Sequence, residues 1–124
     1  MPGPSAMVDD DQKDFEAVFA ELRESFRSRL PEVAKELSAV LELCDGPPRR
    51  PAEMSAALER LQGTAHSLAG QGGTFGFPEI SIAAADLEDY VEGLNGKGAA
   101  ARNDAVLARL QEAIGSLLRI TANC

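Results

Sequence analysis

The amino-acid sequence predicts an all-α protein: an antiparallel four-helix bundle with a preceding N-terminal helix. Apolar residues recur at steps of three and four over most of the chain, which is the period of an α-helix. Segments rich in proline and glycine separate these periodic stretches. No segment shows the alternation of a β-strand, and the connections are short enough to make neighbouring helices antiparallel.

The N-terminal part of the chain predicts a flexible tail over residues 1–8 and two helices, and the helical bundle is expected to occupy residues 9–124. Proline is accepted in a first helical turn and disfavoured later, so Pro31 predicts a break or kink. We therefore expect one helix near 9–29 and another near 31–44. Their shared apolar stripe comprises Phe15, Phe19, Leu22, Phe26, Leu30, Val33, Leu37, Val40 and Cys44.

Three more helices follow the loop "CDGPPRRP". Pro51 is predicted to open the third helix, which "GGTFGF" ends, and Pro78 to open the fourth, which "NGKG" ends. Asn103 or Asp104 is suited to cap the last helix, because their side-chain oxygens accept hydrogen bonds from its first free amides.

The composition excludes several classes of function. Twelve Lys and Arg against 20 Asp and Glu give a net charge of −8, which argues against nucleic-acid or anionic membrane partners. No apolar run approaches the ~18 residues of a membrane span, and the N-terminus lacks a signal peptide, so we expect a cytoplasmic protein. With one histidine and two widely separated cysteines, we expect no metal and no bound cofactor.

The single histidine, His66, lies in the segment "TAHSLAGQGGTFGF". Helical geometry places it about 120° from the middle of its helix's apolar stripe, on an outer flank. Its helical neighbours are Gln62, Gly63, Ala69 and Gly70, with Gly73 one turn further along. Each interior glycine destabilises a helix by about 1 kcal/mol relative to alanine, so fold stability does not explain this choice. Two explanations stay open: close approach of another molecule, or tight packing of a neighbouring helix.

Glu88 is a candidate to orient His66. Glu88 directly follows Leu87 in the apolar stripe of its helix, and His66 directly follows Ala65 in the stripe of its own helix. Adjacent antiparallel helices would therefore bring the two side chains together. A carboxylate that accepts the Nδ1–H bond leaves Nε2 unprotonated and nucleophilic. The alternative is a solvated acidic face that includes Asp86 and Glu92, and the residues alone favour this alternative.

The segment "AHSLAGQGGTFGF" resembles the phosphoacceptor segment of histidine-containing phosphotransfer (Hpt) domains, most closely that of chemotaxis-type sensor kinases. The family pattern is a histidine followed by an apolar residue, a lysine and a glycine at two, three and four residues, and by a glycine at ten. These positions are His66, Leu68, Ala69, Gly70 and Gly76. The resemblance covers about residues 9–121, and Glu88 falls where the chemotaxis-type version carries the carboxylate that bonds the histidine.

The resemblance implies a phosphorelay carrier in two-component signalling. His66 would accept a phosphoryl group on Nε2 and exchange it with an aspartate of a response-regulator receiver domain that holds Mg²⁺. A sensor histidine kinase would act in trans. Residues that permit docking and close approach would be Gln62, Gly63, Ala69, Gly70, Gln71 and Gly73. Phe75 and Phe77 are interpreted as structural residues that close the turn after this helix.

One residue departs from the family pattern. Ala69 stands where the family has lysine, and no Lys or Arg occurs between Leu61 and Gly96. A neutral hydrogen bond from Gln71 would replace a charge-assisted one that is about twice as strong. We therefore expect a phosphohistidine with a shorter lifetime or a shifted transfer equilibrium.

Two alternatives accompany this interpretation. No ATP-binding sequence is present, so we expect a phosphocarrier and not a kinase. The length favours a free-standing protein, and a piece of a larger kinase stays open as the alternative. The rival function is a non-phosphorylated helical module that docks a receiver domain or another signalling partner, and Ala69 supports it. Dimerisation through the apolar stripes is disfavoured because the core requires them, so we expect a monomer.

Overall fold

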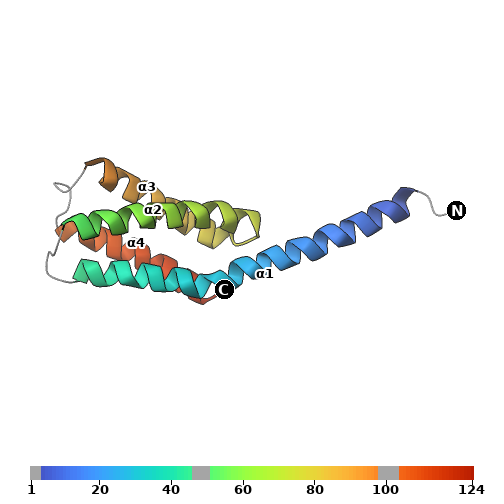
Figure 1. The fold of residues 1–124 in the computed structure, drawn as a ribbon, viewed down its shortest axis with the longest axis horizontal. Helices are drawn as coiled ribbons and strands as arrows, with labels where there is room; N and C mark the ends of the chain where they lie inside the picture. The colour runs from blue at the N-terminus through green and yellow to red at the C-terminus, as the bar shows by residue number, and fades with distance from the viewer. Residues whose placement is uncertain (1–3, 46–50, 98–103) are drawn as a thin grey trace.

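The computed structural model describes residues 4–45, 51–97 and 104–124, which form four α-helices (Figure 1). They are α1 (Pro4–Asp45), α2 (Pro51–Thr74), α3 (Pro78–Lys97) and α4 (Asp104–Ala122). The residues within these ranges include no β-strand. The predicted all-α fold, a four-helix bundle, is confirmed, and Pro51 and Pro78 begin their helices as expected. Asn103, one of the two predicted caps, lies outside the described residues.

Helix α1 differs from the prediction because it is one continuous helix of 42 residues that contains Pro31. The predicted division into helices near 9–29 and 31–44 was therefore wrong. The apolar stripe keeps the same helical phase on both sides of Pro31, and burial of its second half favours a continuous helix over a break. The helix also changes direction as it leaves the bundle, as helices that contain proline often do (Figure 1). It begins at Pro4, so residues 4–8 of the predicted tail are helical, and residues 1–3 lie outside the described residues.

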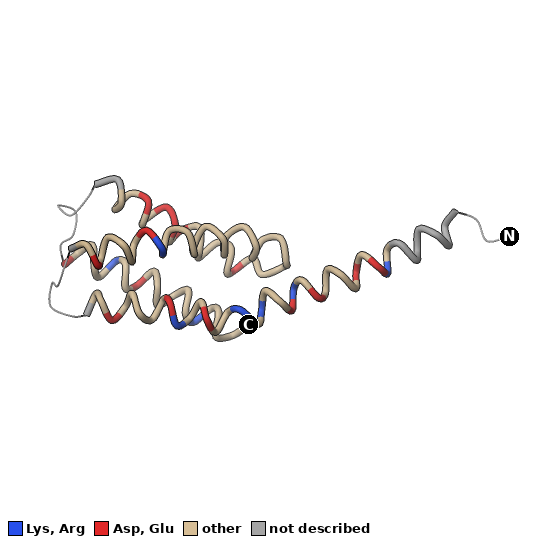
Figure 2. The backbone as a smooth tube through the Cα atoms, in the orientation of Figure 1, with Lys and Arg blue, Asp and Glu red and all other residues tan. Residues whose placement is uncertain are grey.

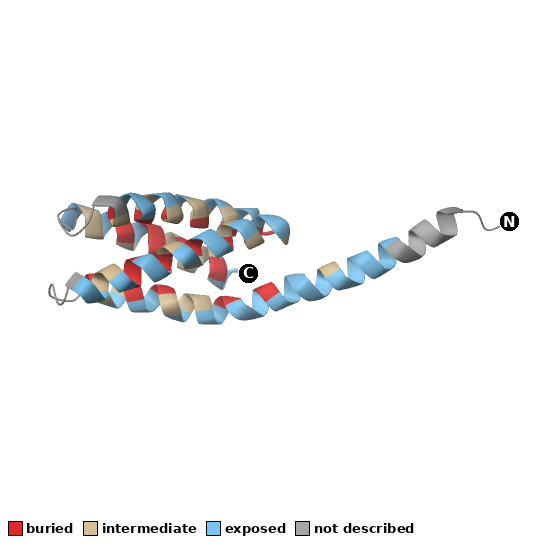
Figure 3. Cartoon of the chain, turned by 45° about the horizontal axis from the view of Figure 1, so that its top comes forward, coloured by how far each residue is buried: buried red, intermediate tan, exposed pale blue. Residues whose placement is uncertain are grey.

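The core lies where the apolar stripes of the four helices face one another (Figure 3). Burying an aliphatic or aromatic side chain contributes about 1.5–3 kcal/mol to folding, so these contacts account for the bundle. The largest fully buried side chains are Phe26, Leu37, Leu61, Ile80, Leu87, Val91, Leu110, Ile114 and Leu117.

The N-terminal part of α1 extends beyond the bundle and does not contribute its stripe to the core (Figures 1 and 3). Phe15 is 68% exposed and Leu22 is 49% exposed, whereas Phe26 is buried. The prediction that one stripe from Phe15 to Cys44 packs into the core was therefore wrong for its first members. The helical period is the same in both parts, but the neighbouring helices end near Phe26.

Aromatic side chains connect α1 to the turn between α2 and α3. Phe75 lies between Phe19 and Phe26, with ring centroids 5.9 and 5.8 Å away, and Phe77 lies 5.4 Å from Phe26. Gly76 has a φ of +84°, a conformation that favours glycine, and allows the amide of Phe77 to donate to the carbonyl oxygen of Gly72 at 2.7 Å. Phe75 and Phe77 thus close this end of the bundle.

None of the described helices combines the length and the apolar character that a membrane span requires. Cys44 is buried and Cys124 is exposed, and neither takes part in a disulfide bond.

Candidate functional site

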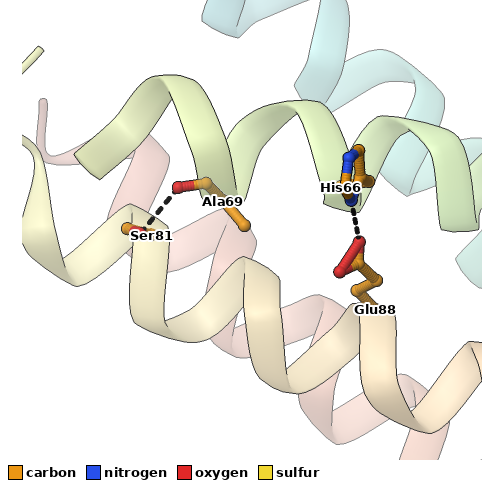
Figure 4. A network of polar contacts seen from close by, with 4 residues as sticks. All are labelled: His66, Ala69, Ser81 and Glu88. Carbon is orange, nitrogen blue, oxygen red and sulfur yellow. Dashed lines mark hydrogen bonds and ion pairs between the residues drawn. The ribbon is translucent and has the colours of Figure 1, made fainter. Parts of the chain in front are cut away.

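The structure brings His66 on α2 and Glu88 on α3 into direct contact (Figure 4). His66 Nδ1 lies 2.6 Å from Glu88 Oε2, a short distance for a nitrogen–oxygen hydrogen bond. The histidine side chain is 80% exposed, whereas that of Glu88 is only 20% exposed. Glu88 therefore does not belong to a freely solvated acidic face. Its contact to Nδ1 leaves Nε2 as the ring nitrogen open to another molecule.

Close packing of α2 against α3 determines this contact. Gly72 is buried, and a Cβ atom there would lie 3.1 Å from the backbone nitrogen of Ser81. A Cβ atom at Gly73 would lie 3.3 Å from Ser81 Oγ. The same Ser81 hydroxyl donates a hydrogen bond of 2.7 Å to the carbonyl oxygen of Ala69 (Figure 4). Gly73, which the sequence assigned to docking, thus has a structural role in the contact between the two helices.

Gly63 and Gly70 have no such role. A Cβ atom at either position would meet nothing within 4 Å. The packing of the bundle therefore requires neither glycine, although together they cost α2 about 2 kcal/mol in helix propensity. Of the two explanations that the sequence left open, tight packing of a neighbouring helix therefore does not apply to these two positions, and close approach of another molecule stays a prediction.

His66 lies in an open hollow of about 500 Å³ whose charged lining is acidic. Three of the six lining residues are glutamates, and none is lysine or arginine. Glu92, which the sequence placed on a solvated face, is one of them. A phosphoryl group on Nε2 would therefore sit among carboxylates that repel it. The lining residues are Glu59, Gln62, Gly63, His66, Glu88 and Glu92.

The two predicted docking glutamines are held by neighbouring helices. Gln62 Oε1 accepts a hydrogen bond of 2.6 Å from Asn95 Nδ2 on α3. Gln71 Oε1 accepts one of 3.0 Å from Arg29 Nη2 on α1. The sequence offered no signal for Asn95 or Arg29, because these contacts depend on how the helices are rotated against one another.

Gln71 does not lie in the hollow of His66. It lines a second groove, of about 400 Å³, between α1 and α2, together with Arg29 and Arg60. By helical geometry it is rotated about 140° from His66, too far to assist a phosphoryl group on that ring. The expected replacement of the missing lysine by Gln71 is therefore not supported.

No group of three or more His, Cys, Asp or Glu side chains within the described ranges is arranged to hold a metal ion. The expectation that Mg²⁺ is held by a partner stays a prediction.

The chain matches a known family of protein domains. The family model described as Hpt domain matches residues 21–119, most of the chain. The chain belongs to the Hpt domain family. Hpt domains transfer phosphoryl groups through a histidine in phosphorelays and are carriers, not kinase domains, so the resemblance read from the sequence is confirmed. No curated protein and no solved structure matches this Hpt domain significantly.

Proposed function

We propose that this Hpt domain carries a phosphoryl group on His66 Nε2 and exchanges it with an aspartate of a response-regulator receiver domain. The observation that supports the proposal best is an imidazole that is 80% exposed and bonded through Nδ1 to Glu88. Glu88 accepts the Nδ1–H bond, and the lone pair of Nε2 attacks the phosphorus atom. The Nε2–P bond forms as the bond from phosphorus to the aspartyl oxygen breaks, and the aspartate leaves as a carboxylate.

The surface around His66 supports close approach of such a partner. In-line phosphoryl transfer depends mainly on positioning, and an obstacle of one side chain would keep the two proteins apart. Gly63 and Gly70 present no side chain, and Gln62 is fixed by Asn95. Mg²⁺ held by the receiver would neutralise the charge of the transferring group, which the carboxylates of this chain do not.

The acidic hollow supports a direction of transfer. Glu59, Glu88 and Glu92 line it, and Ala69 supplies no cation. Repulsion raises the free energy of the phosphorylated histidine relative to the free one. We therefore place the transfer equilibrium further toward the receiver than in a chain with lysine at position 69. A sensor kinase that acts in trans and a cytoplasmic location are parts of the same proposal.

The test is a transfer assay with purified proteins. The chain is mixed with phosphorylated receiver domains and Mg²⁺, and phosphate that is labile in acid and stable in base is measured on it. The His66→Gln variant is the control for the phosphoacceptor. Label on the wild type alone is the expected result, and equal label on both proteins would move the acceptor elsewhere.

The rival function, docking without phosphate, has Ala69 in its favour because the usual lysine is missing. The same assay separates the two functions. A receiver that binds the chain measurably but transfers no phosphate to it would establish the docking module.

A further inference from the structure

Gln62 is the one side chain lining the hollow, apart from His66 itself, that can donate a hydrogen bond. The remaining lining residues are three glutamates and Gly63. An ionised carboxylate only accepts hydrogen bonds, whereas a glutamine amide carries two donors on Nε2 and an acceptor on Oε1. Gln62 lies one helical turn before His66 on the same face of α2. Side chains of a helix lean toward its N-terminus, so the imidazole leans toward the turn that contains Gln62.

A contact with α3 fixes the orientation of the Gln62 amide. Asn95 Nδ2 donates a hydrogen bond of 2.6 Å to Gln62 Oε1. The same Nδ2 lies 3.5 Å from the carbonyl oxygen of Leu58, which can only accept, so the amino group of Asn95 is directed at α2. Oε1 of Gln62 is therefore engaged. Its Nε2 group has no hydrogen-bond partner among the residues that the structure describes and is available to another acceptor.

The charges around the hollow give this donor an importance that it would lack beside a lysine. Four of the five acidic residues of α3 lie between positions 86 and 92, and Figure 2 shows them together in the middle of the helix. Ala69 supplies no cation to balance them. A hydrogen bond to an ionised oxygen is stronger than one between neutral groups, so a neutral amide donor still stabilises a phosphoryl group here.

We propose that Gln62 Nε2 donates a hydrogen bond to the phosphoryl group on His66, and that Asn95 is the positioning residue that orients this amide. The inference rests on the proposed function, because it concerns the same histidine. Gln62 then takes over part of the role of the missing lysine, from the turn before the histidine and not from the turn after it. If the amide turned over, Oε1 would face the phosphoryl oxygens and repel them.

NMR spectroscopy tests the hydrogen bond directly. Phosphoramidate phosphorylates the histidine without a receiver domain, and ³¹P NMR verifies the product. Proton–nitrogen spectra follow the side-chain amide of Gln62, which is assigned by its absence from the Gln62→Met variant. We expect one Nε2 proton signal to move downfield on phosphorylation, while the amide of Gln71, which lies outside the hollow, stays in place. An unmoved Gln62 signal in phosphorylated protein would overturn the proposal.

The lifetime of the phosphohistidine tests the energetic effect. Gln62→Met keeps the length of the side chain and removes the donor, so the lifetime should fall about three- to tenfold. Thr64→Val is the matched control. It removes another hydrogen bond of α2, that of 2.9 Å from Thr64 Oγ1 to Glu36 on α1, outside the hollow, and should keep the wild-type lifetime. Circular dichroism verifies that the variants are folded. A Gln62→Met lifetime equal to the wild type, or longer, would refute the proposal.

A double-mutant cycle tests the role of Asn95. Asn95→Ala retains Gln62 but frees its amide, so the lifetime should fall by less than in Gln62→Met. In a chain that already carries Gln62→Met, Asn95→Ala should have no further effect, because Asn95 acts only through Gln62. Additive losses would refute the positioning role.

The outcomes also separate this inference from the proposed function. A receiver domain that transfers no phosphate would refute the proposed function alone, because phosphoramidate produces the phosphohistidine without it. A phosphorylated chain in which Gln62 does not respond would refute the inference alone. Absence of any label on His66 after treatment with phosphoramidate would refute both.

Discussion

Ser81 on α3 donates a hydrogen bond of 2.7 Å to the carbonyl oxygen of Ala69, three residues beyond His66. This bond joins α3 to the α2 position where the family usually has lysine. Ala69 is partly buried against the core, so a longer side chain there would have to extend along the surface toward solvent. The backbone at this position is already fixed, and only the side chain differs from the family pattern.

Ala69→Lys should lengthen the lifetime of the phosphohistidine. A lysine would add a charge-assisted interaction with the phosphoryl group, next to a hollow lined by three carboxylates. One such interaction corresponds to an increase in lifetime of up to about tenfold. The protein is phosphorylated chemically with phosphoramidate, and ³¹P NMR follows the loss of the signal. Ala39→Lys, at an exposed position on α1, is the control for an added charge elsewhere. Equal lifetimes for wild type and Ala69→Lys would contradict the electrostatic argument.

Glu88→Gln should slow phosphoryl transfer to His66 by about tenfold, because the neutral amide accepts the Nδ1–H bond more weakly than a carboxylate. The initial rate of transfer from a phosphorylated receiver measures the effect. Asp89→Asn removes an exposed neighbouring carboxylate and should leave the rate unchanged. A similar loss in both variants would indicate that general charge, and not the bond to His66, controls the rate.

Gly70→Ala should stabilise the protein and impair its docking. The new Cβ meets nothing within 4 Å, so helix propensity raises the free energy of unfolding by up to about 1 kcal/mol. Urea denaturation measures this gain. Gly93→Ala on α3 also meets nothing within 4 Å and should give a similar gain with no change in transfer rate. If Gly70→Ala transfers phosphate as fast as Gly93→Ala, close approach does not explain the glycine.

Gly72→Ala should have the opposite effect on stability. Its Cβ would lie 3.1 Å from the nitrogen of Ser81 and 3.2 Å from the oxygen of Phe77, both backbone atoms. Separating α2 from α3 to make room should cost about 1–3 kcal/mol, more than the helix propensity gained. Urea denaturation measures the loss in free energy of unfolding. A variant as stable as Gly70→Ala would show that the two helices adjust freely.

The sequence predicted much of the fold and the central pair of the site. Periodicity and the helix-opening residues Pro51 and Pro78 indicated α2 and α3. The positions beside Ala65 and Leu87 allowed a contact of His66 with Glu88, and only the resemblance to Hpt domains favoured it over a solvated acidic face. These features repeat along one helix or follow from antiparallel packing, so a single sequence contains them.

Other features depend on where neighbouring helices end and how they rotate. Phe15 and Leu22 share the period of Phe26, and nothing in that period indicates that the bundle stops before them. The contacts of Gln71 with Arg29 and of Gln62 with Asn95 join different helices through long side chains. Continuity through Pro31 depends on tertiary packing that overrides a local preference.

The α2–α3 turn has a consequence for the order of folding. His66 and Glu88 are separated by 22 residues along the chain, and the aromatic turn at 75–77 lies between them. Closing a short loop costs little conformational entropy, and contacts of low sequence separation form early. We expect α2 and α3 to associate before α1 and α4, whose connections to them are longer, join them. The geometry of the phosphoacceptor would then be established by the first tertiary contacts of the folding chain.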